Sequence, residues 1–105
     1  MKNKNSNSVQ FAKVLADTTR QKIMDMLCCD ELNVSEVAEK AGIKQPTATH
    51  HLSVLRKAGL VTMRTEGKSS IYTLNQERIV NCCGTLIEKF APDSKMTIVV
   101  KNIKD

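Results

Sequence analysis

The sequence has no long apolar run and few residues that interrupt helices. No segment approaches the roughly 20 apolar residues of a membrane-spanning helix, and the polar start at residues 1–8 has no hydrophobic secretion signal behind it. Two prolines and four glycines exclude a collagen-like or low-complexity chain, while 41% hydrophobic and 26% charged residues are typical of a globular protein. We therefore expect a cytoplasmic protein with no membrane partner.

The sequence also lacks the arrangements that enzymes and secreted proteins use. We find no paired carboxylates, no glycine-rich phosphate loop and no Cys/His catalytic arrangement, so an enzyme is not expected. The four cysteines form two adjacent pairs, Cys28-Cys29 and Cys82-Cys83, and are not spread as in a disulfide framework. In a reducing compartment they are expected to be free thiols.

The length allows one domain, and the positive charge is concentrated in its middle. The 105 residues suffice for one modest core. Residues 40–70 hold six Lys or Arg against Glu66 alone, an excess equal to the net charge of +5 of the whole chain. Such a concentration favours a surface that faces phosphates, although an unevenly charged solvated surface is the alternative.

Apolar spacing and capping residues predict about five helices. Asp17 is suited to cap a helix, Gly42 to end one and Pro46 to begin the next. After Gly59 the pattern alternates through a Gly67 turn, which predicts a two-stranded hairpin. The expected fold is mainly α with a small β-hairpin, a winged helix-turn-helix. The expected organisation is a flexible tail at 1–8, the domain at 9–92 and a second tail at 93–105, in which 96–100 reads as a short strand or an adhesive segment.

Several sequence runs resemble the ArsR/SmtB family of bacterial winged-helix repressors. They are the Leu15-Ala16-Asp17-Thr18-Thr19-Arg20 run, the segments 31–37 and 45–61 (with His50-His51-Leu52 and Leu55-Arg56-Lys57-Ala58-Gly59-Leu60-Val61), and the residues Glu66-Gly67-Lys68 and Tyr72-Thr73-Leu74. The resemblance covers roughly residues 9–91. It implies a homodimer built on the first and last helices, which binds an inverted-repeat operator in double-stranded DNA and is released by an inducer.

A recognition helix reads the major groove with short polar side chains near its N-terminal end. We expect Gln45, Thr47, Thr49, His50 and Ser53 to contact bases or nearby groups. Arg56 and Lys57 are expected to meet phosphates or acidic neighbours, and the wing residues Arg64, Lys68, Ser69 and Ser70 to contact the DNA backbone or the minor groove. Adjacent helical residues point about 100° apart, so His50 and His51 are not expected to chelate one ion; one should face the groove and the other the scaffold.

The sensor is where the chain departs from its relatives. The family's arsenic site has two thiols where this chain has Asn33 and Ser35, and its zinc site needs Asp and His, which residues 76–90 lack. The remaining candidates are Cys28, Cys29, Cys82 and Cys83, if the second and last helices bring them together in one subunit. They would sense a reactive sulfur species, an oxidant or a thiophilic metal or metalloid, and no other cofactor is expected. The alternatives are thiols that only pack in the core, an inducer unrelated to cysteine, or no sensor site.

Overall fold

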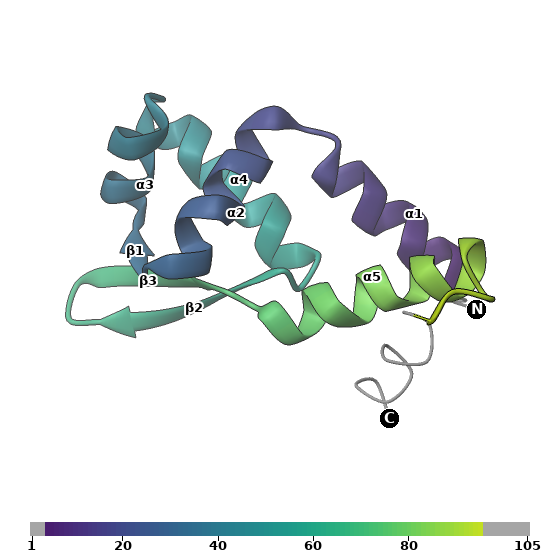
Figure 1. Cartoon of the computed structure of the whole chain (residues 1–105). Helices are drawn as coiled ribbons and strands as arrows, with labels where there is room; N and C mark the ends of the chain where they lie inside the picture. The colour runs from purple at the N-terminus through teal and green to yellow at the C-terminus, as the bar shows by residue number, and fades with distance from the viewer. Residues whose placement is uncertain (1–3, 96–105) are drawn as a thin grey trace.

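A computed structural model describes residues 4–95 of the protein. It contains five helices and three strands in the described part: α1 Lys4–Leu15, α2 Thr18–Cys29, β1 Leu32–Asn33, α3 Val34–Ala41, α4 Gln45–Lys57, β2 Val61–Glu66, β3 Ser69–Leu74 and α5 Gln76–Phe90. Helices α1 and α5 lie side by side at one end, while α3 and the sheet lie at the other (Figure 1). The expected winged helix-turn-helix is therefore confirmed.

The helix boundaries follow from the capping residues. The Oδ1 of Asp17 accepts a hydrogen bond from the Arg20 N–H at 2.9 Å and begins α2. Asn33 and Glu36 form a capping box that begins α3, each side chain accepting from the other residue's backbone N–H. Gly42 ends α3 in the left-handed conformation, with φ at 69°. This conformation turns the chain into α4, as the sequence predicted.

The sheet has one strand more than the expected hairpin. Its order is β1-β3-β2, all antiparallel, with Leu32 opposite Tyr72 and Met63 on the other side of Tyr72. Strand β1 has two residues, and two residues carry no alternation by which the sequence could reveal a strand. It forms because the link between α2 and α3 passes along the free edge of β3.

The core lies between α2, α3, α4 and the base of the sheet. Its fully buried side chains are Ile23, Val37, Leu52, Leu55, Leu60 and Val61, and Phe11 and Val14 attach α1 to it. On α5, half-buried Ile79, Cys82, Cys83 and Leu86 pack against the same cluster. Phe90, the last residue of α5, is 73% exposed.

The chain ends differ in part from the expected tails. Helix α1 begins at Lys4, inside the segment 1–8 that was expected to be flexible, and Ser8 is buried. After α5, residues 91–95 are exposed. The expected strand or adhesive segment at 96–100 lies outside the described residues.

Candidate nucleic-acid interface

The interface is built on α4, which shows one apolar and one polar face. Ala48, Leu52 and Leu55 are buried at helical spacing and fix the rotation of the helix about its axis. The opposite face carries Gln45, Thr47, Thr49, His50, Arg56 and Lys57, all exposed, and half-exposed Ser53. Helix α4 contains no Asp or Glu. Its free face therefore presents hydrogen-bonding groups and positive charge only.

The N-terminal end of α4 is positioned by α3. Lys44 is the N-cap residue and makes no side-chain capping bond, so the first backbone N–H groups of the helix have no side-chain cap. The Nε2 of Gln45 donates to Ser35 Oγ at 2.6 Å, which ties the first residue of α4 to α3. Gln45 thus has a partner within the protein, whereas the side chains of Thr47 and Thr49 have none in the part of the chain that the structure describes.

The two neighbouring histidines have different surroundings. His50 is exposed, whereas His51 is half-buried and its Nδ1 lies 3.3 Å from the Arg20 guanidinium. A guanidinium only donates, so the Nδ1 of His51 accepts. This division agrees with the expectation that one ring faces outward and the other the scaffold. Within residues 4–95 no group of three His, Cys, Asp or Glu side chains could hold a metal ion.

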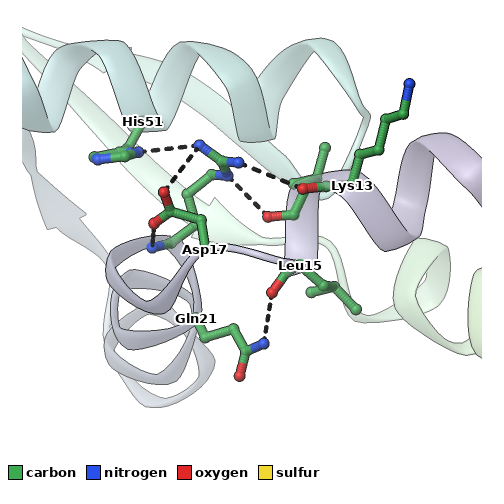
Figure 2. Close-up of polar contacts among 7 residues, drawn as sticks. Lys13, Leu15, Asp17, Gln21 and His51 are labelled. Atoms are coloured by element: carbon green, nitrogen blue, oxygen red, sulfur yellow. Dashed lines mark hydrogen bonds and ion pairs between the residues drawn. The ribbon is translucent and has the colours of Figure 1, made fainter.

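Arg20 connects three helices at this point. Its Nε donates to Val14 O at 2.8 Å, its second terminal nitrogen lies 3.5 Å from Lys13 O, and its other nitrogen lies 3.7 Å from Asp17 Oδ2. Figure 2 shows these contacts converging between the end of α1, the start of α2 and His51 of α4. The Arg20 backbone N–H, and then the nearby Arg20 guanidinium, hold the pKa of the Asp17 carboxyl below its ordinary value. This contact could not be predicted from the sequence, because it depends on tertiary structure.

The wing places its predicted contact residues on different sides. Lys68 and Ser69 are exposed beside the Gly67 turn at its tip. Arg64 follows Met63 and so points to the opposite face of the sheet from Met63 and Tyr72. There it donates to Glu31 at 2.8 Å and to Glu66 at 3.0 Å.

The Glu31 carboxylate joins the wing to the segment before β1. Besides the Arg64 bond, it accepts from the Thr73 hydroxyl at 3.2 Å. The Arg64 and Thr73 hydrogen bonds hold the pKa of Glu31 below its ordinary value. The role of Glu31 could not be predicted from the sequence, because its proximity to the wing depends on β1. The charge of Arg64 is thus already paired within the protein.

The four cysteines lie in two separate places and are free thiols. Cys28 and Cys29 are exposed at the end of α2, beside the sheet, while Cys82 and Cys83 are half-buried on α5. Helix α5 packs mainly against α1, not α2 (Figure 1). The expected close packing of the second and last helices is therefore wrong for this subunit. Burial, followed by the neighbouring Cys82, raises the pKa of Cys83.

The arrangement defines a DNA-binding protein of the winged helix-turn-helix class, and the relatives agree. Residues 17–63 match the sequence model of the family described as "Bacterial regulatory protein, arsR family". An arsenical resistance operon repressor of Staphylococcus aureus is 34% identical over 92 residues, covering 88% of this chain and 86% of that protein. One of Staphylococcus xylosus is 42% identical over 65 residues, covering 62% of each. The chain belongs to the ArsR family of transcriptional regulators and is not an enzyme.

A solved structure extends the likeness to the fold. The homodimeric winged helix-turn-helix DNA-binding domain of a Mycobacterium bovis protein matches with a TM-score of 0.66 at 28% identity, covering 83% of this chain and 79% of that chain. Among residues 4–95 we find no helix with the length and apolarity needed to span a bilayer.

Proposed function

We propose that the chain is a homodimeric repressor that places α4 of each subunit in successive major grooves of an inverted-repeat operator and leaves the DNA when an inducer acts. The observation that carries this proposal is the outward face of α4, which bears hydroxyl, imidazole and cationic groups and no carboxylate. Such a face can form hydrogen bonds with base edges and with phosphates, and it carries no negative charge that the phosphates would repel.

The side chains divide into base-reading and phosphate-binding groups. Thr47, Thr49, His50 and Ser53 are short or planar and face outward from α4, which suits base contact. Gln45 reaches bases only if it exchanges its bond to Ser35. Arg56, Lys57 and the tip residues Lys68 and Ser69 suit the backbone. Arg64, paired with two carboxylates on the far face, supports the wing in our proposal and does not bind DNA.

The dimer is proposed to form through α1 and α5. These helices lie against each other and leave Val9 and Phe90 exposed, 50% and 73% respectively. Large exposed apolar side chains on neighbouring elements are typical of a surface that another protein covers. The homodimeric M. bovis relative supports the same state.

Sensing through cysteine is proposed for the two exposed thiols, Cys28 and Cys29, which an oxidant, a reactive sulfur species or a thiophilic metalloid can reach. The named arsenical repressors among the relatives support a metalloid. The separation of this pair from Cys82 and Cys83 favours a second candidate, an inducer that does not involve cysteine.

Fluorescence anisotropy on the chain's own upstream DNA tests the DNA-binding part. His50→Ala should cost about 1–3 kcal/mol on the operator and little on a random duplex. Lys68→Ala is the matched control, and it should weaken both duplexes alike and lower the salt slope by about one. Equal binding of operator and random DNA by the wild type would refute operator reading.

The same assay tests the sensor. The reduced protein is treated separately with a persulfide donor, an oxidant and arsenite. Release of DNA that is lost in the Cys28→Ser, Cys29→Ser double variant supports thiol sensing at α2. Retention of DNA in all three treatments would assign the inducer to a site without cysteine.

A further inference from the structure

A hollow of about 470 Å³ opens between α4 and the hairpin. Thr49, Ser53, Arg56 and Lys57 line it from α4, and Tyr72 lines it from β3. Every one of these side chains carries a hydrogen-bond donor, two of them are cations, and none is a carboxylate. The lining therefore suits an anion.

The donors of the hollow have no competing partners. The side chains of Thr49, Ser53, Lys57 and Tyr72 make no hydrogen bond or ion pair within residues 4–95. Among the described residues, the one side-chain hydrogen bond of Arg56 goes to the Met63 sulfur, a weak acceptor, at 3.7 Å. This differs from Arg64 on the other face of the sheet, whose guanidinium is occupied by two carboxylates. The charge of Arg56 remains available to a ligand.

The register of the sheet explains how Tyr72 reaches this place. Tyr72 lies opposite Met63, so both side chains point to the same face, the face on which Val61 is buried against the core. Arg56 of α4 contacts the Met63 sulfur and so lies on the same face of the sheet as Tyr72. Arg56 and Tyr72 therefore line the hollow from two different elements, α4 and β3.

We propose that this hollow binds one phosphate of the DNA backbone in each subunit, with Tyr72 as a ligand from the wing. Arg56 and Lys57 balance the phosphate charge, and the Tyr72 hydroxyl donates to one of its oxygens. The proposal rests on the proposed function, because a duplex seated on the outward face of α4 brings a backbone against the adjoining hairpin. Four of the five lining residues belong to α4, on whose outward face the duplex is proposed to lie, and this favours a phosphodiester over a free phosphate ion.

The first test is Tyr72→Phe, which keeps the ring and removes the hydroxyl. We expect a loss of affinity of roughly threefold to tenfold, equal on operator and random duplexes, because a backbone contact carries no sequence information. Arg56→Gln should lower the salt slope by about one. His50→Ala is the matched control and should lose affinity on the operator only. Unchanged affinity of Tyr72→Phe on both duplexes would overturn the proposal.

A double-mutant cycle locates the phosphate. Operator duplexes are made with a neutral methylphosphonate at one backbone position at a time, and the wild type should lose affinity at one position in each half-site. At that position Tyr72→Phe should add no further loss, since its partner is already altered. Additive losses at every position would show that Tyr72 does not contact a phosphate.

A third measurement separates DNA phosphate from free phosphate. Tyr72 is the only tyrosine of the chain, so 3-fluorotyrosine gives one fluorine resonance from the hollow. A shift with duplex, and none with millimolar inorganic phosphate at matched ionic strength, supports the proposal. A shift with inorganic phosphate alone would assign the hollow to a free anion. If the wild type binds no DNA, the proposed function fails first, independently of Tyr72.

Discussion

Removal of the Arg20 guanidinium is expected to destabilise the protein and to loosen α4. Arg20→Met keeps most of the stem, so the difference reports on the head group. The side chain is 15% exposed, and its short bond to Val14 O at 2.8 Å is charge-assisted, while the contacts to Lys13 O, His51 and Asp17 are longer. One good charge-assisted bond and several weak ones give a loss of about 2–3 kcal/mol in the free energy of unfolding. For a domain of about this size the thermal unfolding midpoint should fall by roughly 8–24 °C.

The matched control is Gln21→Ala. Gln21 also holds the end of α1, through a 2.6 Å bond to Leu15 O, but it is neutral and exposed and has no contact with α4 (Figure 2). Its loss should be close to 0.5 kcal/mol. Urea unfolding at one protein concentration measures both variants, since dimerisation makes stability depend on concentration. Equal losses in the two variants, or an unaffected operator affinity in Arg20→Met below its midpoint, would refute the reasoning.

Three further predictions concern acid, thiols and the turn. Folding lowers the pKa values of Asp17 and Glu31, so the two ionised carboxylates stabilise the folded protein fully above about pH 4.5. This stabilisation is lost as the pH falls through the lower pKa values of the folded state. Urea midpoints measured between pH 7 and 3 should therefore be level and then fall, less steeply for Glu31→Gln. Alkylation followed by mass spectrometry should modify exposed Cys28 and Cys29 before Cys83, whose pKa is raised by burial; the reverse order would contradict the placement of α5. Gly42→Ala should lower the free energy of unfolding by about 1–2 kcal/mol, because φ at Gly42 is 69° and alanine is strained in that conformation. No atom lies within 4 Å of the added carbon, so the loss reports on the backbone conformation alone. An unchanged free energy of unfolding would contradict the turn geometry.

The residues of α4 show what local sequence can and cannot predict. Buried Ala48, Leu52 and Leu55 repeat at helical spacing, and this repeat predicted both the helix and its polar face. The different roles of His50 and His51 were only half predictable. The two histidines lie at the edge of the buried face of the helix. His51 is the one that faces the scaffold because it meets Arg20, which lies 31 residues earlier in the chain.

The wing was predicted as a hairpin but not in its contacts. Alternation alone could have placed Arg64 and Tyr72 on opposite faces. It could not supply the carboxylate that meets Arg64, since Glu31 is brought there by β1, a strand too short to leave a pattern. The prediction that the second and last helices pack together was wrong for a related reason. Which helix α5 packs against is decided by the shapes of several helices together, and no single apolar stripe contains that information.

The outward face of α4 is held by side chains that do not belong to it. Gln45 ties its start to α3, Arg56 touches the hairpin through Met63, and His51 meets Arg20 at the corner of α1 and α2. Of these attachments, the Arg20 contact is the one that leads toward α1, and α1 packs against α5. A displacement of the α1 carbonyls at Lys13 and Val14 would change the bonds of Arg20 and therefore the hold on His51. The orientation of the reading face thus depends on the same helices through which the dimer is proposed to form.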